Sequence, residues 1–195
     1  MEVKQTESKS FTVYAADLGY FEITARKYKD DALNIRESYQ GTCTPSFHLL
    51  SSVALELFPK LLIAFEVCKK YRDNTEASED DIRANILTEI KRFNHDLSAL
   101  YNSIPDLMNH LGIEKVTEFR NGFVWEHRFT FKDGKNLQIK DVEAVRYGSF
   151  AKNRDVMTLC VFDNRIVELL NKVEAYVQTK SLTMRDALLG SANLG

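Results

Sequence analysis

The 195-residue chain has few cysteines, and their arrangement argues against a disulfide framework. Cys43, Cys68 and Cys160 are odd in number, far apart and set mostly in apolar surroundings, without the paired spacing of a zinc or redox motif. The four histidines are also isolated from one another, so we expect no metal site and no cofactor. Because such cysteine usage suits a reducing compartment, we expect the protein to be cytoplasmic.

Long apolar runs and an excess of charge are missing as well. The longest apolar run, residues 61–65, is far too short to span a bilayer, so we expect no membrane association. A count of 26 basic and 28 acidic residues gives a net charge of −2. The protein as a whole therefore has no electrostatic attraction to nucleic acid. The eight glycines never cluster into a phosphate-binding loop. With 44% hydrophobic residues, the chain is long enough for one packed core, and we predict a single domain over residues 1–195.

Helical periodicity dominates what the sequence does contain. Apolar residues recur at steps of three and four over residues 14–39, which predicts a long amphipathic helix that Gly41 ends. A second helix is predicted over residues 45–72, because Thr44 is a typical N-cap and a proline follows it. Pro59 lies inside this second helix and is expected to kink it.

The third helical pattern leaves two interpretations open. Apolar residues keep helical spacing over residues 82–104, after a capping-box pattern at residues 78–81. In one interpretation the helix is unbroken, and His95 lies almost opposite the apolar stripe. In the other the helix breaks at Asn94, which becomes the N-cap of a new helix and places Asp96 near the positive end of its dipole.

The later part of the chain changes to an alternating pattern. Apolar residues occupy every second position on both sides of Asp133-Gly134, which predicts a β-hairpin over about residues 122–140 whose aromatic face packs on helices. A closing helix is predicted to begin between residues 155 and 163, and the tail, about 181–195, is predicted to be loose or to be ordered only against a partner. The predicted fold is therefore mainly α, an up-and-down helical bundle with an inserted β-hairpin before the last helix.

Three short motifs lie on these predicted elements. They are Glu56 with Lys60, then His95-Asp96-Leu97, and finally Arg146-Tyr147. Together, over roughly residues 45 to 175, they resemble the pattern of HEPN domains, the higher eukaryotes and prokaryotes nucleotide-binding family. One branch of that family has a Glu followed four residues later by Lys, a Gly-His-Asp-Leu element and a late Arg-Tyr pair. Two positions depart from the pattern, since Asn94 replaces the glycine and Pro59 replaces an apolar residue.

The resemblance implies a polar ligand site and a homodimer, because HEPN domains usually pair through their helices. The implied ligand-binding residues are Glu56, Lys60, His95, Asp96, Arg146 and Tyr147. In such a site the guanidinium of Arg146 could hold a phosphate. From spacing alone, Glu56 and Lys60 would instead be an i,i+4 ion pair at the rim of the core, and His95 and Asp96 a cap or a surface pair.

The function that the resemblance implies is a nucleotide- or RNA-associated module without robust catalysis, working with a protein partner in a defence or toxin–antitoxin setting. One alternative is a metal-independent endoribonuclease that uses Arg120 and His127, separated by six residues, or else Arg146 with His95. On a single strand, residues 120 and 127 would be roughly 23 Å apart and on opposite faces, which argues against that site. The other alternative is a structural protein whose ribbon and tail bind a partner.

Overall fold

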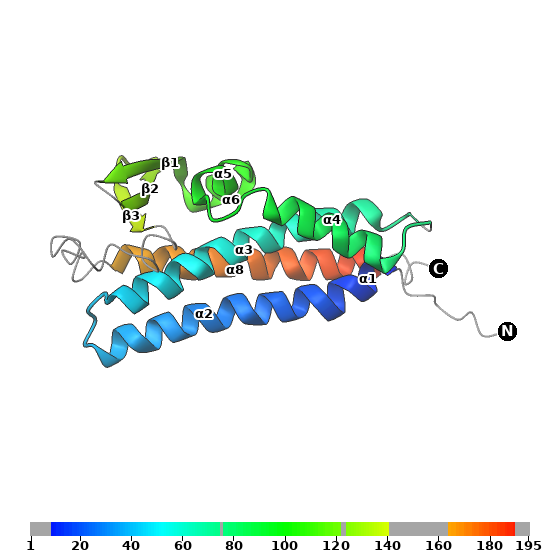
Figure 1. The fold of residues 1–195 in the computed structure, drawn as a ribbon, viewed down its shortest axis with the longest axis horizontal. Helices are drawn as coiled ribbons and strands as arrows, with labels where there is room; N and C mark the ends of the chain where they lie inside the picture. The colour runs from blue at the N-terminus through cyan, green and yellow to red at the C-terminus, as the bar shows by residue number, and fades with distance from the viewer. Residues whose placement is uncertain (1–8, 75, 122–123, 141–163, 190–195) are drawn as a thin grey trace.

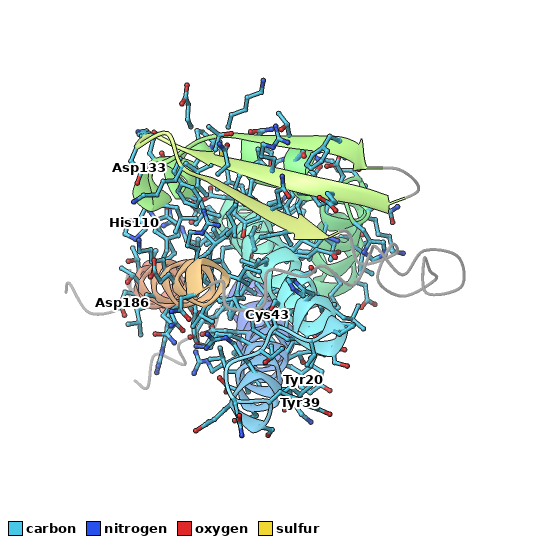
Figure 2. The ribbon with its side chains drawn as sticks, turned by 90° about the vertical axis from the view of Figure 1, so that its left-hand side faces the viewer. Tyr20, Tyr39, Cys43, His110, Asp133 and Asp186 are labelled. Carbon is cyan, nitrogen blue, oxygen red and sulfur yellow. The ribbon has the colours of Figure 1, made fainter. Side chains whose placement is uncertain are left out.

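The structure, a computed structural model, describes residues 9–74, 76–121, 124–140 and 164–189 (Figure 1). Three long helices, α2 (Gly19–Ser38), α3 (Pro45–Tyr71) and α8 (Asn164–Leu189), lie side by side. Viewed along these helices, the sheet forms a layer over α3 and α8, and α2 lies on their other side (Figure 2). The mainly helical bundle with an inserted hairpin that the sequence predicted is thus confirmed.

The first long helix is assembled from three consecutive segments. A short helix, α1 (Lys9–Val13), leads through a π-helical turn, η1 (Tyr14–Leu18), into α2. The predicted end of this helix is confirmed, because Gln40 and Gly41 follow with left-handed φ values of 52° and 86°. Glycine has no Cβ and adopts this conformation without steric strain.

Helix α3 is the centre of the bundle. Its predicted start is confirmed, since the Thr44 hydroxyl accepts a hydrogen bond from the backbone N–H of Phe47 at 3.2 Å and Pro45 occupies the first helical position. The helix continues across Pro59 as one element. It contacts α2, α4, α8, α5 and the sheet, so even its polar residues in the middle turns are buried.

Two shorter helices begin and end at signals that can be read locally. Helix α4 (Glu79–Lys91) starts with the expected capping box, in which the Ser78 hydroxyl accepts from the Asp81 amide and the Asp81 carboxylate accepts from the Ser78 amide. Helix α6 (Pro105–Leu111) ends at Gly112, which has a φ of 66°.

The chain between α4 and α6 differs from both sequence interpretations. The helix is not continuous, because α5 (Leu97–Asn102) is separated from α4 by a turn at residues 92–95. The N-cap of α5 is Asp96 and not Asn94, since Asp96 Oδ1 accepts a hydrogen bond from the backbone N–H of Ala99 at 3.0 Å. Asn94 instead has a left-handed φ of 46°, a conformation that interrupts helical hydrogen bonding.

The sheet contains one strand more than the predicted hairpin. Its antiparallel order is β1 (Ile113–Asn121), β2 (Val124–Phe131) and β3 (Asn136–Lys140), with Asp133-Gly134 in the turn before β3. Strand β1 was missed because its apolar residues Ile113, Val116 and Phe119 are three positions apart and lack the alternation of a strand. The face that packs on the helices carries buried apolar residues from all three strands, namely Val116, Phe129, Leu137 and Ile139.

The predicted loose tail is wrong for residues 181–189, which continue α8. The Tyr14 hydroxyl donates a hydrogen bond to the carbonyl oxygen of Ser181 at 2.9 Å, and Met184 and Leu188 are each 8% exposed. Packing against α1 and η1 therefore orders this segment. The predicted start of the closing helix and residues 190–195 lie outside the described residues. None of the helices in the described ranges has the length and apolar character that crossing a bilayer requires.

Candidate functional site

The candidate residues of α3 contact the turn that precedes α5. Lys60 Nζ donates hydrogen bonds to Glu56 Oε1 and, at 2.6 Å, to the backbone carbonyl oxygen of Asn94. The second carboxylate oxygen of Glu56 lies 3.0 Å from Nδ1 of His95. We call Glu56, Lys60, Asn94 and His95 the α3–turn cluster. It brings together two sequence motifs that are about forty residues apart in the chain.

Burial in this cluster is uneven. The side chains of Glu56 and Lys60 are 8% and 10% exposed, whereas that of His95 is 36% exposed. The predicted i,i+4 ion pair is therefore confirmed, but it lies inside the core and not at its rim. A buried ion pair needs hydrogen bonds to both charges to offset desolvation, and here Asn94 and His95 supply them. A ligand can meet the cluster from the side of the turn, where Asn94 is exposed and His95 is partly exposed.

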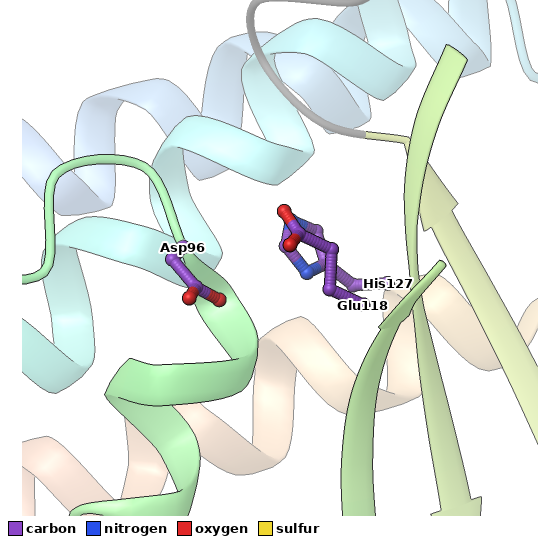
Figure 3. A group of neighbouring side chains, drawn as sticks. All are labelled: Asp96, Glu118 and His127. Atoms are coloured by element: carbon purple, nitrogen blue, oxygen red, sulfur yellow. The ribbon is translucent and has the colours of Figure 1, made fainter. Parts of the chain in front are cut away.

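A second group of polar residues joins α5 to the sheet (Figure 3). Asp96, Glu118 and His127 each direct one potential ligand atom toward the others, and these atoms all lie within 4.8 Å of one another. Glu118 of β1 and His127 of β2 are directly opposite in the strand register, while Asp96 is held at the N-cap of α5. Ser98 Oγ lies 3.3 Å from Nδ1 of His127. We call Asp96, Glu118 and His127 the α5–sheet cluster.

The α5–sheet cluster spans the boundary between core and solvent. His127 is fully buried, Asp96 is partly exposed and Glu118 is exposed. Two carboxylates and an imidazole are a donor set that divalent metal ions use, and within the described ranges it is the one such group of three. No local pattern in the sequence indicates this group, because its members come from three separate elements. The expectation of no metal site rested on the spacing of histidines along the chain, and this spacing does not reveal a group of residues that only the fold brings together.

The proposed nuclease pair lies on two strands and not on one. Strand β1 ends at Asn121 and β2 begins at Val124, and position 120 pairs with position 125. Positions 120 and 127 are therefore diagonal neighbours across antiparallel strands, where backbones are about 7–8 Å apart. The predicted separation of roughly 23 Å on opposite faces is wrong, because the chain reverses direction within the interval. His127 itself is fully buried.

Helix α5 holds both clusters in place. The fully buried Tyr101 donates a hydrogen bond to the carbonyl oxygen of Leu55 in α3 at 3.1 Å, and its ring packs on Phe129 of β2 at 5.0 Å in a T-shaped arrangement. Burial raises the pKa of the Tyr101 hydroxyl, which therefore stays protonated and keeps donating. Residues 94–98 thus lie between α3 and the sheet, with the α3–turn cluster on one side and the α5–sheet cluster on the other.

Two of the residues implied by the resemblance, Arg146 and Tyr147, lie outside the described residues. The remaining four are all within or next to the segment 94–98: Glu56, Lys60, His95 and Asp96. No protein-family model, no curated protein and no solved structure matches this chain.

Proposed function

We propose that the protein is a HEPN-like nucleotide- or RNA-associated module without robust catalysis, whose ligand binds where His95 reaches the surface. The observation that supports this function is the direct contact between the two motifs on which the resemblance rests. Glu56 and Lys60 come from one motif and His95 from the other, and they form a single hydrogen-bonded cluster. The two partners that offset desolvation of the buried ion pair, Asn94 and His95, both come from the turn that carries the second motif.

The conformation of Asn94 also supports the proposal. The related HEPN branch has glycine at this position, and Asn94 has a φ of 46°, which asparagine and glycine adopt more readily than most residues. The departure from the family pattern is therefore compatible with the same turn. Lys60 holds this turn through the Asn94 carbonyl, and the turn presents His95.

The chemistry of the site suits recognition better than a reaction. Lys60 already donates to Glu56 and Asn94, so its charge is engaged inside the protein. An imidazole whose Nδ1 is held by a carboxylate can still donate or accept a hydrogen bond at Nε2. The phosphate of a nucleotide would be held by Arg146, as the resemblance implies. The described residues around His95 include no nucleophile paired with it as a base.

Binding of fluorescein-labelled single-stranded RNA and of ATP tests this function. The wild type, His95→Ala, Arg146→Ala and the control His110→Ala would be compared by fluorescence anisotropy and calorimetry after each is shown to be folded. His110 is an exposed histidine whose ring packs on Tyr176 of α8 and not on the α3–turn cluster. We expect at least about tenfold weaker binding for His95→Ala and Arg146→Ala than for the wild type. The control His110→Ala should bind as tightly as the wild type. Absence of binding to both probes, or equal binding by all variants, would refute the proposal.

A metal-independent ribonuclease that uses Arg120 and His127 is a second candidate, because the strand register makes their positions diagonal neighbours. The full burial of His127 counts against it, since a general base must reach the proton it removes from the substrate. Cleavage of single-stranded RNA in EDTA, lost in both Arg120→Ala and a folded His127→Gln variant, would replace our first proposal with this one.

The proposal includes a homodimer in a reducing cytoplasm, working with a protein partner in a defence or toxin–antitoxin setting. Tyr20 and Ile23 are 74% and 65% exposed and lie three residues apart on α2, which gives a second copy an apolar surface to meet. Cys43 and Cys68 are unpaired thiols, as a reducing compartment favours. Sedimentation velocity of the wild type and of Ile23→Glu tests the dimer, which the charged variant should weaken.

A further inference from the structure

We propose that Asp96, Glu118 and His127 bind one divalent metal ion of the Zn²⁺ or Mn²⁺ type. This inference goes beyond the proposed function, which needs no metal. Imidazole nitrogen and carboxylate oxygen are donors that both ions accept, and the set contains no thiolate that would select a softer ion. Water would complete the coordination of an ion held by three protein ligands.

The distances support a shared ion. Ligand atoms about 2.1 Å from a tetrahedral ion are about 3.4 Å from each other. The three candidate atoms lie within 4.8 Å of one another, so their separations must shorten by up to about 1.4 Å for all three to bind one ion.

The backbone position of each metal-binding side chain is set by secondary structure. Asp96 Oδ1 accepts the capping hydrogen bond from Ala99, which orients the carboxylate and leaves Oδ2 for coordination. Glu118 and His127 are paired across β1 and β2, so their side chains leave the sheet on the same face. A site built on a helix end and on paired strands is more rigid than a site built on loops.

Ser98 supplies the outer contact that metal-binding histidines usually have. Its hydroxyl oxygen lies 3.3 Å from Nδ1 of His127. In the tautomer with the proton on Nδ1, the ring would donate to Ser98, and the proposal assigns Nε2 as the coordinating nitrogen. A hydrogen bond of this kind fixes the ring orientation and makes the coordinating nitrogen more basic.

Charge and burial also fit a cation. Asp96 and Glu118 place two carboxylates next to the buried His127, an arrangement that attracts a divalent cation. The ion would enter from the Glu118 side, which is open to solvent, while His127 closes the inner side. When bound, it would connect α5 to the sheet and so stabilise the folded protein against heat.

Calorimetric titration of EDTA-treated protein with ZnCl₂ and with MnCl₂ tests the site. The variants are Asp96→Asn, in which asparagine can still cap α5, and Glu118→Gln. The matched control is Glu114→Gln, another exposed glutamate on β1 that lies outside the cluster. We expect one ion per chain in the wild type and in the control, with affinity at least about tenfold weaker in both cluster variants. A wild type that binds neither ion, or cluster variants that bind like the wild type, would overturn the proposal.

Two further variants test the role of the ring. His127→Gln, shown by circular dichroism to be folded, should change the visible absorption of bound Co²⁺, because a nitrogen ligand is lost. Ser98→Ala should weaken binding by about 10–100-fold without changing the stoichiometry. Unchanged Co²⁺ spectra in folded His127→Gln would overturn the assignment of that ligand. Nucleotide or RNA binding, measured in EDTA, is independent of these outcomes.

Discussion

Lys60 Nζ and the backbone carbonyl oxygen of Asn94 are 2.6 Å apart, and this hydrogen bond links the middle of α3 to the left-handed turn before α5. The same ammonium group also neutralises Glu56. The buried ammonium group of Lys60 therefore stabilises both the carboxylate of Glu56 and the backbone conformation of Asn94. Substitutions at Lys60 or at Asn94 should both lower the stability of the folded protein.

Replacement of Lys60 by methionine should lower the free energy of unfolding by about 3–5 kcal/mol, because Glu56 would remain buried without its cation. The Glu56 side chain is only 8% exposed. Urea unfolding followed by circular dichroism measures this loss. The double variant Glu56→Met/Lys60→Met should recover much of the stability, since it removes both charges.

The matched control for this prediction is Lys69→Met on the same helix. Lys69 pairs with Glu66 at 3.7 Å, but both side chains are largely exposed, so their attraction is weakened by solvent. Its urea midpoint should equal that of the wild type. Equal losses at Lys60 and Lys69 would contradict the importance of burial.

Valine at position 94 should destabilise the protein by about 1–2 kcal/mol, because a β-branched side chain clashes with the backbone at a positive φ. Asn94 has a φ of 46° and is exposed, so the substitution changes little besides the backbone preference. Asn94→Gly should match the wild type or nearly so. Urea midpoints for the two variants measure the difference, and similar midpoints would show that the turn has another conformation.

Alanine at position 96 should lower stability by about 1 kcal/mol, because the Ala99 amide would lose its capping acceptor. Asp96→Asn should keep most of that stability, since asparagine caps as well as aspartate. Thermal unfolding in EDTA isolates this effect from metal binding. If the asparagine variant unfolds as early as the alanine variant, the side chain is not acting as a cap.

The thiol of Cys68 should react slowly with iodoacetamide at pH 8. Burial, reinforced by the negative charge of Asp17, raises the pKa of the Cys68 thiol from 9.0 to about 12, so almost no reactive thiolate forms. Peptide mass spectrometry of alkylated native protein measures this reaction, with urea-unfolded protein as the fast reference. Rapid native labelling would indicate that the α3 core opens readily.

The same pKa shift affects stability at high pH. The unfolded thiol loses its proton near pH 9.0, whereas the folded thiol keeps it until about pH 12. The stabilising contribution is therefore fully present below pH 9 and decreases as pH rises toward 12. Cys68→Ser should flatten this part of the stability–pH curve in urea titrations, and an unchanged slope would contradict the assignment.

The helix boundaries were predictable because their signals are local. Thr44, Gly41 and the capping box at residues 78–81 each act within three or four residues of the boundary, and the structure confirms all of them. The break before α5 was only half predictable. The helical spacing of apolar residues continues without interruption across residues 92–96. The left-handed turn at Asn94 is held by a hydrogen bond from Lys60 of α3.

The two clusters were decided by the tertiary structure. Spacing in the sequence predicted the Glu56–Lys60 pair, but its burial and its contact with His95 depend on the packing of α3 against a turn 39 residues away. Glu118 and His127 face each other only because the strands pair in this register, and Asp96 joins them only because α5 packs beside the sheet. Local side-chain preferences therefore set where elements begin and end, whereas burial of their apolar faces set which polar residues meet.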